Sequence, residues 1–375
     1  MVLFDICIDN LRKSFKTLGG FIACGVLTLI SSSAFSATTD LSGNGQSDLL
    51  LRNSDCSVSA WIMNGTTVTQ NTSLLGPDAT WTITHVADFN GDGKADLLWR
   101  NTNGSVGMWL MDGANVLSTV SILAVEPNWS VSHVGDFNGD GKADILWRNS
   151  NGSVTLWLMN GGTVSSATGL LGADANWKVT HVADFNGDGK VDLLWKNTNG
   201  SVTAWLMNGA TVASAVGILG ADLNWTISHV ADFNGDGKSD FLWRNKNGAV
   251  TMWLMNGTAV ASAVGLLGPD ANWSVTHVAD FNGDKKADIL WRNNNGAVTT
   301  WLMNGATVTT AAGLLGADPN WRVSHTGDFD GDGKADLVWR NVNGSITMWL
   351  MSGVTPSSTK GLLGAGLSQV VPPAP

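Results

Sequence analysis

Short runs of alternating apolar and polar residues, separated by polar turns, make up most of the chain. One stretch, residues 177–220, contains four such runs, at 177–183, 193–196, 201–207 and 211–219. Alternation with a period of two is the pattern of a β-strand, and Asn-Gly between two such runs is a strong hairpin signal. The pattern therefore predicts four short antiparallel strands in each stretch, and it predicts no helix beyond the N-terminal segment.

The third run of a stretch is apolar on both faces. Val154, Leu156 and Leu158 alternate there with Trp157 and Met159. A strand that is apolar on both faces belongs to a sheet that is covered on both sides. Four-stranded sheets packed face to face around an axis form a β-propeller, whereas a linear solenoid would need polar capping units, and the sequence has none.

The stretch recurs seven times at a constant interval. Each copy carries an acidic nonapeptide, D-x-N-x-D-G-x-x-D or a close variant. Its first residue recurs at Asp40, Asp88, Asp136, Asp184, Asp232, Asp280 and Asp328. A period of about 48 residues indicates one supersecondary unit per repeat. The sequence thus predicts an all-β, seven-bladed β-propeller over residues 38–375, with four antiparallel strands per blade.

The first and last repeats are incomplete. A W-x-V-x-H run precedes six of the acidic loops but is missing before Asp40, and Gln369 stands one full period after Trp321 in the tail of the chain. We therefore expect the tail to supply part of the missing strand of the first blade and to close the ring. Pro372 and Pro373 limit how much strand it can form. An imperfect or open closure is the alternative.

Residues 1–37 have the pattern of an export signal. A basic stretch precedes an uncharged apolar run at positions 18–30, and small residues follow, which predicts cleavage near Ala34. The run is short for a bilayer span, so an uncleaved anchor is the alternative. We expect a secreted or cell-surface protein with no membrane span after cleavage. Its one remaining cysteine, Cys56, cannot form an internal disulfide.

The formal net charge is −10, from 31 acidic and 21 basic residues. Most of the acidic residues lie in the seven loops instead of being spread over the surface. Nucleic-acid binding would require clustered lysine and arginine, so the charge pattern argues against a nucleic-acid partner.

Each acidic loop offers oxygen donors at positions 1, 3, 5 and 9 and a backbone carbonyl at position 7. Oxygen-only ligands favour calcium over zinc or copper, so we predict up to seven Ca²⁺ sites. An EF-hand would require Glu at position 12, where Trp99 stands in the second loop. The predicted metal ligands are Asp40, Ser42, Asn44 and Asp48; Asp88, Asn90, Asp92, Lys94 and Asp96; Asp136, Asn138, Asp140, Lys142 and Asp144; Asp184, Asn186, Asp188, Lys190 and Asp192; Asp232, Asn234, Asp236, Lys238 and Asp240; Asp280, Asn282, Asp284, Lys286 and Asp288; and Asp328, Asp330, Asp332, Lys334 and Asp336.

The alternative is a set of metal-free Asx turns, because Asp, Asn and Gly are ordinary turn formers. The loops also differ from one another. The Asp40 loop has only two carboxylates and should bind calcium most weakly, whereas Asp330 gives the seventh loop a fourth carboxylate. Lys285 replaces the glycine at position 6 of the sixth loop, which costs about 1 kcal/mol if that position needs a positive φ.

The 19 tryptophans fall at three positions of the repeat. Interblade packing explains those in the third strand, whereas those in the W-x-V-x-H run are candidates for stacking on sugar rings, on the same face as the following histidines. A histidine bonded to a neighbouring carbonyl is the structural alternative. The candidate ligand-binding residues are Trp81, His85, Trp129, His133, Trp177, His181, Trp225, His229, Trp273, His277, Trp321 and His325.

A basic residue also recurs once per repeat, and we expect it to form a surface or interblade ion pair. A lysine in the fourth copy argues against a required bidentate contact. The seven residues are Arg52, Arg100, Arg148, Lys196, Arg244, Arg292 and Arg340.

The segment DFNGDGKADIL, residues 136–146, resembles the FG-GAP or VCBS-type repeat of integrin α-chain propellers, bacterial surface proteins and some fungal lectins. The resemblance covers residues 40–364. It implies a seven-bladed propeller with calcium between the first and second strands of each blade. The similarity to propeller lectins implies carbohydrate binding between blades.

These features favour a secreted, calcium-binding propeller that acts as a non-catalytic, multivalent binding module. A glycan is the first hypothesis for its partner, because near-identical units give avidity toward a repeated ligand. A cell-surface adhesion or protein-interaction scaffold is the alternative. A secreted hydrolase is the remote alternative, since the nonperiodic charged residues form no set of nucleophile and base and no residue is assigned a catalytic role. We expect a monomer.

Overall fold

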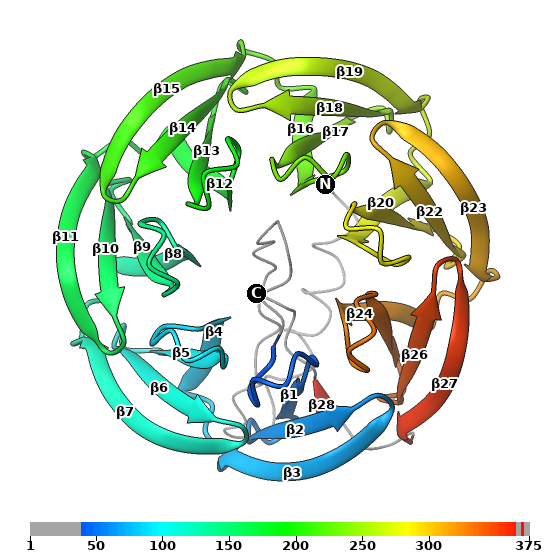
Figure 1. The fold of residues 1–375 in the computed structure, drawn as a ribbon. Coiled ribbons are helices and arrows are strands. Elements are labelled where there is room, and N and C mark those ends of the chain that lie inside the picture. The colour runs from blue at the N-terminus through cyan, green and yellow to red at the C-terminus, as the bar shows by residue number, and fades with distance from the viewer. Residues whose placement is uncertain (1–38, 365–368, 371–375) are drawn as a thin grey trace, which may run out of the picture.

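A computed structural model describes residues 39–364 and 369–370. In this part of the chain, 28 strands form seven four-stranded antiparallel sheets, which stand as blades around a central axis (Figure 1). The predicted all-β, seven-bladed propeller is confirmed. The predicted export signal, residues 1–37, lies outside the described residues.

The blades follow one another along the chain, except that the innermost strand of the first blade, β28, comes from the end of the chain. Within each blade the strands are given from the innermost to the outermost. The strands are β28 Gln369–Val370, β1 Leu49–Asn53, β2 Val58–Asn64 and β3 Thr67–Leu75; β4 Trp81–Ala87, β5 Asp96–Asn101, β6 Val106–Asp112 and β7 Asn115–Leu123; β8 Trp129–Gly135, β9 Asp144–Asn149, β10 Val154–Asn160 and β11 Thr163–Leu171; β12 Trp177–Ala183, β13 Asp192–Asn197, β14 Val202–Asn208 and β15 Thr211–Leu219; β16 Trp225–Ala231, β17 Asp240–Asn245, β18 Val250–Asn256 and β19 Ala259–Leu267; β20 Trp273–Ala279, β21 Asp288–Asn293, β22 Val298–Asn304 and β23 Thr307–Leu315; and β24 Trp321–Gly327, β25 Asp336–Asn341, β26 Ile346–Ser352 and β27 Thr355–Leu363.

The tail of the chain completes the first blade, as predicted. Strand β28 pairs antiparallel with β1, and Gln369 lies opposite Asn53. In the second blade, Trp81 lies opposite Asn101 at the equivalent place. Gln369 therefore takes the register position that a tryptophan holds in the other six blades.

Backbone hydrogen bonds between loops join each blade to the next. The Ala143 amide donates to the Asp88 carbonyl at 2.7 Å, and the Ser47 amide donates in the same way to the Asp328 carbonyl at 2.6 Å. The second of these bonds connects the seventh blade to the first. The described blades therefore form a closed ring.

The hydrophobic core lies between adjacent blades. Phe89, Leu98 and Met108 of the second blade pack against Ile145 and Trp147 of the third, and all five are buried. Equivalent clusters fill the other junctions. Both faces of the middle strands are consequently covered, as their apolar pattern predicts.

The inner strands contain a β-bulge that the alternation of the sequence does not reveal. In β12, Val179 lies opposite Trp195 but His181 lies opposite Leu194, so residue 180 is the extra residue. An extra residue moves the following side chains to the other face of the sheet. The prediction that Trp177 and His181 share one face is therefore wrong, and the same bulge occurs in the other five W-x-V-x-H strands.

Candidate functional site

In the second to seventh blades the acidic loop joins the first and second strands, whereas in the first blade the Asp40 loop precedes β1. The first aspartate of each loop organises the loop backbone. One oxygen of Asp88 accepts a hydrogen bond from the Gly91 amide at 2.6 Å, and the other accepts one from the Gly93 amide at 2.8 Å. Both glycines have positive φ, 79° and 81°. The chain thus wraps around the carboxylate, which is why glycine recurs at these two positions.

The side chains at positions 3 and 5 accept hydrogen bonds from backbone amides of their own loop. An oxygen of Asn90 accepts the Asp92 amide at 2.9 Å, and an oxygen of Asp92 accepts the Lys94 amide at 2.9 Å. These contacts are those of Asx turns. An ionised carboxylate has about four lone-pair sites, so it can accept an amide hydrogen and still face a cation. The donor set, carboxylate and amide oxygens alone, fits calcium.

Position 9 is placed differently from the other three. Asp96 is fully buried, and its two oxygens accept the amides of Phe89 at 3.0 Å and Met111 at 2.8 Å. Burial raises the pKa of Asp96 to about 6, and the two backbone hydrogen bonds oppose that rise. This carboxylate therefore ties the loop to β6, and its role as a calcium ligand stays a prediction.

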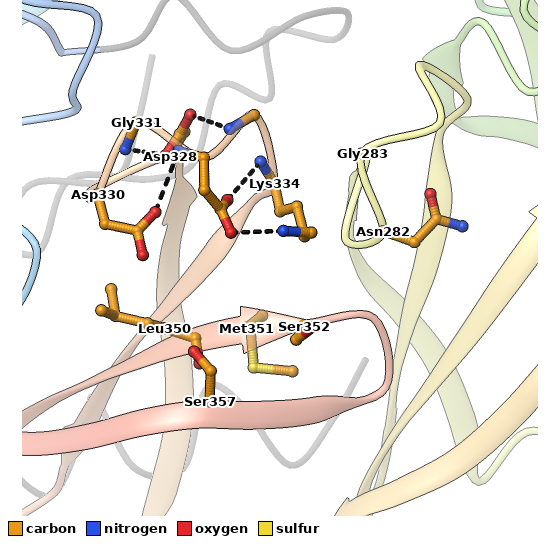
Figure 2. A network of polar contacts seen from close by, with 12 residues as sticks. Asn282, Gly283, Asp328, Asp330, Gly331, Lys334, Leu350, Met351, Ser352 and Ser357 are labelled. Carbon is orange, nitrogen blue, oxygen red and sulfur yellow. Dashed lines mark hydrogen bonds and ion pairs between the residues drawn. The ribbon is translucent and has the colours of Figure 1, made fainter.

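The seventh loop concentrates the most negative charge. Within residues 39–364, Asp328, Asp330 and Asp332 are the one group of three acidic or histidine side chains whose ligand atoms all lie within 4.8 Å of one another. Figure 2 shows Asp328 and Asp330 on this loop. Burial, and then the charge of Asp332, raises the pKa of Asp330. Like charges held this close favour a bound cation.

The lysine at position 7 links the loop to other parts of the ring. The Lys142 ammonium donates to the Asn160 side chain at 2.6 Å, at the end of β10. Gly283 of the sixth loop lies beside Lys334 of the seventh (Figure 2), and a Cβ at Gly283 would be 3.3 Å from the Lys334 Cγ. The loops therefore contact one another around one face of the ring.

The tryptophans and histidines of the inner strands have different surroundings. Six tryptophans at the strand starts, such as Trp225, are half-buried, whereas His85, His133, His181 and His325 are buried. Burial lowers the pKa of His85 to about 4. His229 and His277 are half-buried, like the six tryptophans. The four buried histidines are therefore poorly placed for ligand contact, and the half-buried tryptophans and these two histidines remain as candidates.

At Arg52, Arg100, Lys196 and Arg292 the recurring basic residue reaches across to the next blade. Its contacts there are to backbone carbonyls and, for Lys196, also to the Thr226 hydroxyl. Arg292 donates to the carbonyls of Trp321 at 2.5 Å and Pro319 at 3.4 Å. Lys196 donates to the Trp225 carbonyl at 3.3 Å. The interblade contact is therefore as expected, whereas the expected ion pair is replaced at these residues by hydrogen bonds to carbonyls.

A pocket lies at the junction of the fourth and fifth blades. Its volume is about 220 Å³, and it is lined by Leu219, Asp222, Trp225, Trp243, Thr251 and Trp253. Of these six residues, only Trp225 was predicted from the sequence as a ligand contact. The signal that could have found Asp222 is an acidic residue three positions before each W-x-V-x-H tryptophan.

A family model described as FG-GAP-like repeat matches six overlapping segments, residues 40–99, 88–147, 136–195, 184–243, 232–291 and 280–339. The chain belongs to this family. Its FG-GAP-like repeats build the architecture of a binding or scaffold module.

Solved structures show the same fold at low sequence identity. A structure titled as BBS1N in complex with ARL6DN has 10% identity and a TM-score of 0.52, covering 88% of this chain and 100% of that chain. A structure from a study of two prolyl endopeptidases has 13% identity and a TM-score of 0.56, covering 84% of this chain and 47% of that chain. No curated protein matches the chain. Among the described residues, no helix has the length and apolar character of a membrane span.

Proposed function

We propose that this FG-GAP-like repeat protein is an exported, calcium-stabilised propeller that binds carbohydrate without catalysing a reaction. The observation that carries the proposal is the repeated junction between blades. At six junctions a half-buried tryptophan begins the inner strand, and an acidic residue stands three positions before it. An indole face next to a carboxylate can stack on a sugar ring and accept hydrogen bonds from its hydroxyls.

Calcium would be held by the oxygens of positions 1, 3 and 5 of the acidic loops. Bound calcium would neutralise carboxylates such as Asp328, Asp330 and Asp332, which otherwise repel one another. Because adjacent loops are hydrogen-bonded to each other, relief of this repulsion in one loop also stabilises the contact with the next blade. We therefore assign calcium a structural role, in which it stabilises the exported chain in place of disulfides.

A binding role without catalysis is supported by the chemistry of the repeated residues. Burial lowers the pKa of His85 and His181 to about 4, and because both side chains are buried a substrate has little access to them. The buried aspartates at position 9 are occupied by backbone amides. A general acid–base pair requires two titratable groups in unlike, accessible environments, and the repeats place like groups in like environments.

The test is a glycan array with purified mature protein in calcium buffer and in chelator. We expect binding to a defined group of glycans in calcium and a loss of signal in chelator that follows a loss of thermal stability. Retention of binding by the Trp81→Ala variant alone would be uninformative, because five equivalent tryptophans remain, so a variant with all six replaced is required. Absence of glycan binding by the folded, calcium-loaded protein would overturn the carbohydrate proposal and favour a protein-interaction scaffold.

A further inference from the structure

The inner strand of the first blade receives residues from both ends of the chain. In the second blade, the last residue of the inner strand is Ala87, which lies opposite Asp96. In the first blade Thr39 takes that place, because the Asp48 amide donates to the Thr39 carbonyl at 2.7 Å. At the other end of the same strand, β28 pairs with the last two residues of β1 (Figure 1). This inner strand therefore begins with the C-terminal tail and ends at Thr39.

Four places of this strand lie between Val370 and Thr39. In the second blade, residues 83–86 hold the same four places. One period of 48 residues earlier stand residues 35–38, which directly precede Thr39 in the chain. These four residues lie outside the part of the chain that the structure describes. Their places are indicated by the repeat and by the direct connection to Thr39.

The second of the four places selects a hydroxyl side chain. It is the extra residue of the bulge, and in the other six blades it is Thr84, Ser132, Thr180, Ser228, Thr276 and Ser324. In five of these blades the hydroxyl donates to a carbonyl of the second strand at 3.1–3.4 Å. At this place Ser36 would offer the same donor to the Leu50 carbonyl. Pro372, which would stand there if the tail continued the strand, has neither a hydroxyl nor an amide hydrogen.

The first of the four places is apolar and faces the preceding blade. In the third blade Val131 holds it and packs in one cluster with Leu98 of the second blade and with the tryptophan opposite it. Where the seventh blade meets the first, both partners are smaller. Val338 replaces the leucine and Leu51 replaces the tryptophan of the other six repeats. Phe35 is larger than the valine or isoleucine that holds this place elsewhere, so it would restore the close packing of the junction.

An uncleaved leader would compete with the tail for this strand. Counted by the same period, residues 33–34 fall on the two places that β28 holds. Two segments cannot pair with one edge of β1 at once, so the chain has to end or turn away before Phe35. Small residues one and three positions before the cut mark a leader cleavage site, and the bonds after Ala34 and after Ser36 both have them. Of these two, only cleavage after Ala34 leaves all four residues on the mature protein.

We propose that cleavage between Ala34 and Phe35 creates the mature N-terminus, and that residues 35–38 then complete the inner strand of the first blade beside β28. The inference rests on the proposed export of the protein and names the site of its processing. Hydrolysis by an export-associated peptidase consumes one water and leaves a carboxylate on Ala34 and an amine on Phe35. Removal of the leader therefore lets both ends of the chain fasten the same blade.

Intact-mass measurement and N-terminal sequencing of the exported protein test the processing site. We expect a chain that begins at Phe35. Any other first residue in the exported protein would overturn the assigned site and leave export itself standing. If the chain instead keeps its whole leader and stays in the cell, the proposed export fails, and this inference fails with it.

Hydrogen exchange of the calcium-loaded mature protein tests the strand itself. The chain that begins at Phe35 is compared with one that begins at Thr38. Without residues 35–37, the backbone amides of residues 49–51 should exchange about tenfold faster or more, because the edge of β1 loses its partner. Residues 145–147, the equivalent segment of the third blade, serve as the internal control and should exchange equally in both chains. Equal exchange of residues 49–51 in the two chains would overturn the inference.

Melting of point variants distinguishes the two segments that could fill the strand. Phe35→Ala should lower the melting temperature by about 5 °C, since removal of a buried phenylalanine leaves a cavity. Val131→Ala, the equivalent change in the third blade, shows how sensitive this place is in a blade with a complete inner strand. Val371→Ala is the matched control, because that residue would hold the same place if the tail continued the strand, and it should change little.

Ser36→Pro and Pro372→Ser make the same comparison at the bulge. The first should lower the melting temperature and the second should not. If Phe35→Ala does not fold, Phe35→Leu is the milder variant and should show a smaller loss in the same direction. Losses at Val371 with none at Phe35 would assign the strand to the C-terminal tail and overturn the inference.

Discussion

The amide of Met111 donates a 2.8 Å hydrogen bond to the carboxylate of Asp96, and both residues are buried. The same bond occurs in all seven blades, between an aspartate at position 9 of the loop and a methionine 15 residues later. The second oxygen of Asp96 accepts the Phe89 amide. One side chain thus fixes the end of the loop to the third strand of its blade.

Replacement of Asp96 by alanine should destabilise the protein even without calcium. Two buried amides lose their acceptor, and each unsatisfied group costs about 1–3 kcal/mol, so we expect a loss of about 2–6 kcal/mol. Thermal melting in chelator measures the effect. The control is Asp92→Ala, an exposed position in the same loop, which should cost less than about 1 kcal/mol in chelator. Equal losses for the two variants would contradict a structural role for position 9.

Calcium should raise the melting temperature of the native protein. For sites with dissociation constants of about 10⁻⁴ to 10⁻³ M, 10 mM calcium adds about 1.4–2.7 kcal/mol per occupied site. Asp330→Asn gives the seventh loop the asparagine that the second to sixth loops carry at position 3, and it should weaken calcium binding there while leaving the other loops unchanged. Calorimetric titration reports the number of sites and their affinities. A melting temperature that does not respond to calcium would refute the structural metal.

The repeat made the fold predictable, since its constant period and the alternation of apolar and polar residues define the blade and its four strands. It also placed Gln369 opposite Asn53, because that register follows from counting one period from Trp321. The bulge at Thr180 could not be predicted. Alternation alone places Trp177 and His181 on one face, and only the pairing with β13 shows that they are on opposite faces.

The loop contacts were predictable to different extents. The donor types at positions 1, 3 and 5 follow from the sequence, and these residues do meet in one loop. The partner of Asp96 depends on where β6 lies, which a local pattern does not contain. The pocket at Asp222 and Trp225 depends similarly on how the fourth and fifth blades meet.

Lys285 adopts a left-handed backbone conformation, with φ of 64°, where the other six loops have glycine. The expected need for a positive φ at this position is confirmed. Lys285→Gly should therefore stabilise the protein by about 0.5–1 kcal/mol. The backbone strain that is relieved exceeds the conformational entropy that glycine adds to the unfolded chain. Melting in chelator measures it. Gly93→Lys tests the reverse change, because no atom lies within 4 Å of a Cβ at Gly93, and stabilisation by that variant would contradict the argument.

Acid should destabilise the folded protein through its inner-strand histidines. Burial lowers the pKa of His85 to about 4 from its ordinary 6.5. A histidine whose pKa is lowered by folding binds its proton preferentially in the unfolded state, so stability is lost as pH falls below 6.5 and the loss is complete near pH 4. Position-9 aspartates such as Asp192, whose pKa burial raises to about 7, act in the opposite direction over the same range. The net pH profile of the native protein therefore hides the contribution of each histidine.

A comparison of His85→Gln with the native protein isolates that contribution. Glutamine does not titrate, so the variant should lose less stability than the native protein between pH 7 and pH 5, by about 2 kcal/mol at pH 5 from 1.36 kcal/mol per pH unit. Whatever glutamine costs in packing is the same at both pH values and cancels in the difference. Chemical denaturation at pH 7, 6 and 5 in chelator provides the measurement. Parallel pH profiles for the two proteins would mean that His85 is not buried in the neutral form.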